Sequence, residues 1–356
     1  MAVPTSLRIL AAGVLAAGVA LIAGCSTVGY YVQSIHGHFA MLHAARPIHD
    51  IVADPAVEEP LKQRLQRAQR IRTFASTALA LPDNRSYRSY ADLQRPFVVW
   101  NVFAAPELSL DLKHWCYPVV GCAAYRGYFN HDAADRVAAQ LRADGYEVNV
   151  GGVAAYSTLG WFADPLLNTF ISGTEGQLAG LIFHELSHQV VFVGGDTTFN
   201  ESFATSVERE GVRRWLAVNG DEASRRAYLD FAQRRSQFLD LLLKYRESLA
   251  QNYLAQQPDD VKRARKQQLL SMLKVDYARL RATWGGFAGY DRFFAQDLNN
   301  AHLAAVATYN DWVPAFERLL AQNGGDFARF YEQVKDIAAM PKQRRDDLLR
   351  SMLAQR

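Results

Sequence analysis

Residues 184–202, HELSHQVVFVGGDTTFNES, carry the most polar groups of an otherwise apolar part of the chain. His184 and His188 are four residues apart, so a helix places both imidazoles on one face, one turn above the other. Glu185 stands beside them. Burying these groups is costly unless they are paired or bind an ion. The surrounding sequence, apolar nearly all round, predicts a buried helix over residues 175–193 that carries a functional cluster.

The residues GGDT interrupt this pattern, and a second helix is expected to start near Thr198. At about 1.5 Å per residue, an antiparallel return brings Glu201 level with His188. Thr198 and Glu201 also match a capping box, in which Glu201 only bonds the start of its own helix. Asp196 or Thr197 could cap that helix instead. We expect Glu201 to point toward the histidines, because they otherwise lack a third partner.

Two histidines and a glutamate are the ligands of one type of catalytic zinc site, which keeps a further position open for water. We therefore expect one Zn²⁺ per chain, held by His184, His188 and Glu201. Glu185 is then the general base that takes a proton from the attacking water. The alternative is a pair of hydrogen-bonded core histidines with a chance glutamate between them.

The segments HELSHQ and NESFATSVE resemble the gluzincin metallopeptidases, whose zinc is held by HExxH and a glutamate on the following helix. The second segment is especially similar to the aminopeptidase N and leukotriene hydrolase family. That resemblance assigns the zinc to His184, His188 and Glu201, the general base to Glu185, and a supporting role beside the zinc ligands to Glu208.

Together with the amino-terminal sequence and an expected strand at AAYSTLGWF, residues 154–162, the chain resembles a bacterial lipoprotein family described as predicted aminopeptidases. The resemblance covers most of the mature chain. Aminopeptidase N relatives hold the substrate's amino group with a glutamate upstream of HExxH. The comparable segment here, residues 151–161, contains no carboxylate.

The amino terminus predicts export and lipidation. An apolar stretch from Ile9 to Ile22 is too short to span a membrane comfortably and fits a signal peptide over residues 1–24. It ends in IAGC, which resembles a lipobox with Cys25 as the lipidated residue. Because Ser26 follows rather than aspartate, we expect the outer membrane, facing the periplasm. A plain signal peptide or a short anchor helix is the alternative.

Two further cysteines, Cys116 and Cys122, flank Pro118 and Gly121, which favour a turn. Disulfides persist in exported proteins, so we expect these two to form one, in preference to two free thiols. Composition excludes other classes of protein: 49% hydrophobic residues and a net charge of +3 do not predict a nucleic-acid-binding protein.

Apolar spacing predicts helices for most of the chain, with short β-branched and aromatic runs between about 87 and 160. The fold class is therefore α+β and predominantly helical, a small strand-containing part packed on a helical catalytic part. Basic faces on the long carboxy-terminal helices indicate solvated surfaces, or alternatively a membrane surface. The expected organisation is a signal peptide over 1–24 and a single peptidase domain over 25–356, with a strand-rich part at about 87–160 and a helical catalytic part at about 161–356.

Peptide hydrolysis also needs a hydrogen-bond donor for the oxyanion, commonly a tyrosine or histidine. Tyr156, Tyr290 and Tyr309 are candidates. We favour Tyr309, because Asn299 and Asn300 precede it in a polar break between helices that could line a cleft.

The sequence thus predicts a membrane-anchored zinc peptidase that acts on peptides, with an aminopeptidase favoured. One alternative is a zinc endopeptidase acting on envelope proteins or cell-wall peptides. The other is a binding or scaffolding lipoprotein with a structural zinc site. Glu185 argues against the scaffold, because a structural site needs no base.

Overall fold

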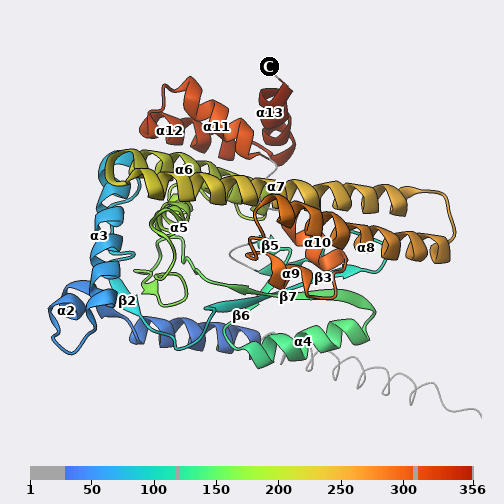
Figure 1. Ribbon diagram of the computed structural model, residues 1–356, viewed down its shortest axis with the longest axis horizontal. Coiled ribbons are helices and arrows are strands. Elements are labelled where there is room, and N and C mark those ends of the chain that lie inside the picture. The colour runs from blue at the N-terminus through green and yellow to red at the C-terminus, as the bar shows by residue number, and fades with distance from the viewer. Residues whose placement is uncertain (1–28, 118–120, 308–311, 355–356) are drawn as a thin grey trace, which may run out of the picture.

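The computed structural model describes residues 29–117, 121–307 and 312–354 (Figure 1). Residues 29–43 form an amino-terminal helix. The other helices are α2 (Ile48–Ala53), α3 (Glu59–Leu79), α4 (His131–Ala143), α5 (Glu175–Ser187), α6 (Thr197–Asn219), α7 (Glu222–Leu254), α8 (Asp259–Thr283), α9 (Asp291–Phe294), α10 (Asn300–Ala307), α11 (Val313–Gln322), α12 (Phe327–Ala338) and α13 (Lys342–Ala354). The predicted class, predominantly helical α+β, is confirmed.

The strands form three small sheets. They are β1 (Arg46–Pro47), β2 (Ser89–Ala91), β3 (Val99–Pro106), β4 (Trp115–Tyr117), β5 (Gly121–Ala123), β6 (Arg126–Tyr128), β7 (Tyr146–Val153) and β8 (Leu166–Leu167). In the largest sheet β3 lies between β6 and β7 and is antiparallel to both. Helix α4 packs on this sheet through Ala134, Ala138 and Leu141, which alternate with solvated residues along the helix.

The main hydrophobic core joins α3, α5, α6, α11 and α12. Figure 1 shows α11, α12 and α13 on the far side of α6 and α7 from the strands. Helices α5 and α6 run antiparallel: the Trp215 indole, late in α6, donates to Glu175 at the start of α5. A glycine at each of two crossing points, Gly180 and Gly211, lets the two helices approach closely.

Helix α5 ends at Ser187, six residues before the predicted end at Val193. The Thr174 capping box fixes its start. At its end, the amides of Gln189 and Val190 bond three residues back, and Asn200 binds both the N–H and the C=O of Val193. The prediction that this helix ends at Val193 was therefore wrong, because the Asn200 side chain of the next helix hydrogen-bonds the backbone of the apolar segment after His188.

Asp196 is the residue that caps α6. Its carboxylate accepts a hydrogen bond from the Phe199 amide at 3.2 Å and receives the Arg345 guanidinium at 2.6 Å. Both partners of that ion pair have side chains only 4% exposed. Since Asp196 provides the cap, Glu201 is not required for capping and is free to turn toward the histidines.

Replacing Asp196 by alanine is expected to destabilise the fold strongly. The change removes the α6 cap and leaves Arg345 buried without its partner, which costs about 3–5 kcal/mol. Asp326→Ala is the matched control: Asp326 caps α12 but its side chain is about half exposed, so the loss is about 1 kcal/mol. Urea denaturation of both variants measures the difference. Equal losses would contradict the assignment of Asp196.

The segment 154–162, expected as a strand, is not one: β7 ends at Val153. Thr158 instead donates to both oxygens of buried Asp164, and Leu159 and Gly160 adopt positive φ. These turns are incompatible with an extended strand. The chain therefore forms a loop beside the end of α5 rather than a sheet edge.

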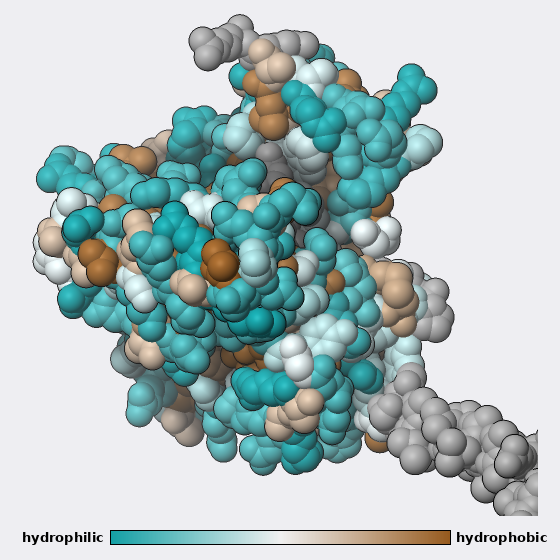
Figure 2. All heavy atoms as spheres, turned by 90° about the vertical axis from the view of Figure 1, so that its right-hand side faces the viewer, coloured by the Kyte–Doolittle hydropathy of each residue, from teal (hydrophilic) through white to brown (hydrophobic). Residues whose placement is uncertain are grey.

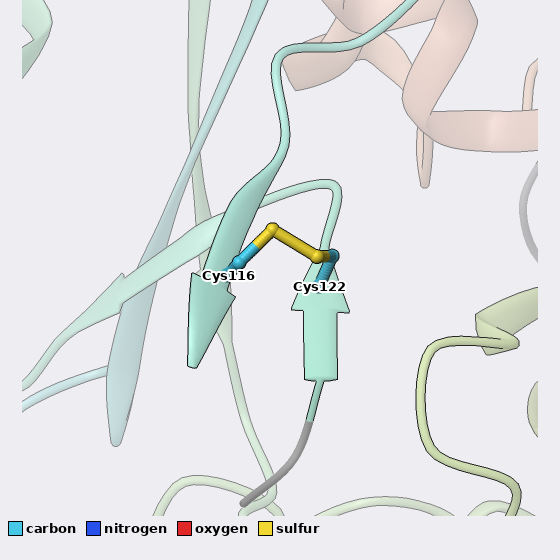
Figure 3. Close-up of a disulfide and its surroundings, with 2 residues drawn as sticks. All are labelled: Cys116 and Cys122. Carbon is cyan, nitrogen blue, oxygen red and sulfur yellow. A yellow bond between two sulfur atoms is a disulfide. The ribbon is translucent and has the colours of Figure 1, made fainter. Parts of the chain in front are cut away.

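Cys116 and Cys122 form the expected disulfide, across the two-stranded β4–β5 sheet (Figure 3). The two cysteines are directly opposite each other in the strand register. Gly121 lies against the backbone of Gly194 and Gly195 in the loop between α5 and α6. The disulfide therefore closes a hairpin that abuts the loop joining the two central helices.

Helices α7 and α8 form a long hairpin with a second hydrophobic core, which α9 and α10 complete. Figure 2, which faces the side of the molecule toward this hairpin, shows a mostly hydrophilic surface with apolar residues scattered among polar ones. Among the residues that the structure describes, no helix is long and apolar enough to cross a membrane.

Candidate metal centre

Helices α5 and α6 bring together the three residues predicted as ligands. His184 lies in the last turn of α5, His188 follows its end, and Glu201 is in the second turn of α6. The Nε2 atom of His184 is 3.2 Å from Glu201 Oε2, and that of His188 is 3.8 Å from Glu201 Oε1. One potential ligand atom from each residue lies within 4.8 Å of the other two.

The chemistry of this donor set fits a metal ion. Burial lowers the pKa of His188 to about 4, so this imidazole is neutral, the form that binds a metal. Its Nδ1 is buried without a hydrogen-bond partner among the described residues. Two imidazole nitrogens facing one carboxylate match a catalytic metal site with three protein ligands.

Glu208, seven residues after Glu201 in α6, contacts the other ring nitrogen of His184. Its Oε2 is 3.2 Å from His184 Nδ1, and its Oε1 accepts a hydrogen bond from Arg235 of α7 at 3.1 Å. Burial alone would raise the pKa of Glu208, but His184 and Arg235 lower it to about 2. A charged Glu208 orients the His184 ring, whose Nε2, 3.2 Å from Glu201 Oε2, is the nitrogen that a metal ion would bind.

Glu185 follows His184 in α5 and is not one of the three grouped residues. Burial raises the pKa of Glu185 to about 7; His184 opposes this effect, while the charge of Glu201 adds to it. A carboxylate with a pKa near neutrality is suited to accept and release a proton at physiological pH. Glu185 therefore has the properties of a general base.

A further carboxylate near Glu185 was not predicted from the sequence. Asp164 is fully buried, and burial raises its pKa to about 6. Its negative charge contributes to the raised pKa of Glu185. Both Asp164 oxygens accept hydrogen bonds from Thr158. Its place after the loop 154–162 gave no local signal of this role.

The predicted tyrosine, Tyr309, lies outside the described residues, and so does Cys25. The reason for favouring Tyr309 was wrong, because Asn300 does not line a cleft. It is fully buried and donates to the backbone carbonyls of residues 106, 107 and 109, while Asn299 donates to Val148. Both asparagines fasten α10 to the sheet.

The other tyrosines differ in their surroundings. Tyr290 is stacked on Phe238 at 4.0 Å in the second core. Tyr156 packs against Phe129, and burial followed by the charge of Asp164 raises its pKa to about 12. Tyr125, which the sequence did not single out, has its pKa raised by burial and then by the charges of Glu201 and Glu185. Tyr125 is therefore a described tyrosine on which the charges of both Glu201 and Glu185 act.

The two-helix frame, the HExxH segment and the glutamate on the following helix bring two histidines and one glutamate together as a possible metal site. The chain belongs to the family described as "Putative aminopeptidase", whose model matches residues 29–349. This family supports peptidase activity on peptide substrates. No curated protein and no solved structure matches the chain.

Proposed function

We propose that this protein is a zinc-dependent aminopeptidase anchored in the bacterial cell envelope. The observation that carries the proposal is the convergence of His184, His188 and Glu201, with Glu185 beside them. These three residues would hold one Zn²⁺. When bound, zinc polarises a peptide carbonyl and lowers the pKa of water toward neutrality.

Side chains of the protein then transfer the proton, orient the ligand His184 and stabilise the oxyanion. Glu185 accepts a proton from the attacking water and returns it to the leaving amine. Glu208 and Arg235 keep the His184 ring oriented through two successive hydrogen bonds. A tyrosine hydroxyl donates to the oxyanion, a role that Tyr309 or Tyr125 would fill.

Substituting Tyr125 by phenylalanine tests that last role. If its hydroxyl stabilises the oxyanion, kcat falls by about 10²- to 10³-fold while metal content is unchanged. Tyr156→Phe is the matched control, because its ring packs against Phe129 and the carboxylate whose charge raises its pKa is Asp164, not Glu201 or Glu185. Activity of Tyr125→Phe at the wild-type level would contradict its role as the donor.

An aminopeptidase must also recognise a free amino group. Glu185, Glu201, Glu208 and Asp164 gather around the centre, and their charges act on one another. Arg235 pairs with Glu208, and His184 lies between Glu201 and Glu208. This group of carboxylates supports a substrate whose amino terminus is cationic, in place of the single glutamate used by aminopeptidase N relatives.

Paired aminocoumarin amides with free and blocked amino groups separate an aminopeptidase from an endopeptidase. A hydrogen bond to a charged group contributes about 1.5–3 kcal/mol, so blocking the amine is expected to lower kcat/KM by roughly 10- to 150-fold. Glu185→Gln protein supplies the background rate. Equal cleavage of both amides would indicate the endopeptidase.

The envelope location in this proposal comes from the lipobox-like sequence IAGC that ends at Cys25. A lipid on Cys25 would hold the enzyme at a membrane, and Ser26 favours the outer one. The Cys116–Cys122 disulfide supports an oxidising compartment.

A further inference from the structure

The amino-terminal helix, residues 29–43, exposes a row of apolar side chains. Val32, Ile35 and Phe39 are 60%, 57% and 54% exposed. Their spacing of three and four residues places them on one face of the helix. Met41, on the opposite face, is buried in the main core. The helix is therefore packed on the protein by one side and presents an apolar stripe on the other.

A loop extends this stripe with two aromatic residues. Trp161 is 80% exposed and Phe162 is 43% exposed. The Phe162 ring lies 6.2 Å from the Phe39 ring and 4.6 Å from the ring of buried His38. Burial lowers the pKa of His38, so the imidazole between the two segments is neutral. The helix and the loop form one continuous surface.

We call this surface the 32–162 patch; it consists of Val32, Ile35, Phe39, Trp161 and Phe162. No aspartate, glutamate, lysine or arginine occurs between residues 9 and 45. Contiguous exposed apolar groups mark interaction sites, whereas single ones are ordinary. The scattered apolar residues on the face seen in Figure 2 are of the ordinary kind.

We propose that the 32–162 patch rests on the lipid bilayer to which the chain is anchored. This inference depends on the lipid anchor at Cys25 that the proposed function includes. Cys25 precedes the helix by four residues, and even a fully extended chain of that length reaches only about 14 Å. A lipidated Cys25 would therefore keep the helix at the membrane surface.

The composition of the patch suits this occupant. Tryptophan prefers the boundary between acyl chains and headgroups, and interfacial helices bury an apolar face there. The same loop reaches the metal centre: Gly160 lies against the side chain of Gln189, next to His188. Bilayer contact at Trp161 would thus hold the loop beside Gln189 and His188 near the membrane surface.

Quenching by brominated phospholipid tests the patch in the full-length protein. The purified protein is bound to phosphatidylethanolamine–phosphatidylglycerol vesicles with bromine near the headgroup end of the acyl chains. We expect the brominated vesicles to quench the tryptophan emission of the wild type. In Trp161→Phe we expect most of this quenching to be lost. Trp284→Phe, at the end of α8 and hydrogen-bonded to Gln237, is the matched control and keeps the quenching.

Vesicle flotation of the wild type and Cys25→Ser tests the lipid anchor separately from the contact between the 32–162 patch and the bilayer. Wild-type protein that fails to float with vesicles contradicts the anchor itself. Protein that floats but whose Trp161 is unquenched and stays open to acrylamide overturns the patch proposal alone. A dimer in detergent that Trp161→Phe dissociates would also overturn it, because a second copy would then cover the patch.

Discussion

Glu185→Gln is expected to bind zinc like the wild type and to hydrolyse peptides about 10²- to 10⁴-fold more slowly. The amide has nearly the shape of the carboxylate, and Glu185 is not among the three ligand residues, so metal binding and folding should persist. It cannot accept a proton, so the attacking water is not activated by the protein. Metal content and kcat are measured on the same preparation.

Glu175→Gln, on the same helix, is the control for this prediction. Glu175 bonds the Trp215 indole far from the centre, and its glutamine variant should keep full activity. Unchanged hydrolysis in Glu185→Gln would contradict its role as general base. Loss of zinc together with activity would show instead that Glu185 is a ligand.

Glu201→Ala is expected to lose both zinc and activity, because it removes one of three protein ligands. Glu208→Gln should weaken zinc binding only by about 10- to 100-fold, as expected for a residue that orients a ligand. Competition with a chelator measures the zinc affinity of both variants. A larger loss in Glu201→Ala than in Glu208→Gln distinguishes a metal ligand from a residue that orients a ligand.

Glu210→Ala is the control on the same helix. Glu210 pairs with Arg213 and Arg214 and is not one of the three grouped residues, so its loss should leave zinc binding intact. Full zinc occupancy in Glu201→Ala would contradict the ligand set.

The grouping of His184, His188 and Glu201 could be predicted because it depends on residues close together in the sequence. The four-residue spacing of His184 and His188 fixes their common face, and the short return through GGDT limits where Glu201 can lie. The sequence also predicted that Asp196 or Thr197 could cap the second helix in place of the Thr198–Glu201 capping box. Asp196 is the cap in the structure.

The surroundings of the centre could not be predicted in the same way. Arg235 reaches Glu208 from a different helix, and Tyr125 comes from the segment that follows the disulfide hairpin. Hydrophobic periodicity describes one element at a time and carries no information on such contacts. The early end of α5 also depends on a contact between elements, because the Asn200 side chain of α6 hydrogen-bonds the backbone of Val193.

Anomalous X-ray scattering at the zinc absorption edge, from crystals of the zinc-loaded protein, tests the central claim most directly. The account predicts one anomalous peak per chain, about 2.0–2.2 Å from Nε2 of His184, Nε2 of His188 and a carboxylate oxygen of Glu201, with Glu185 outside that range. A peak elsewhere, or none at these three residues, would contradict it.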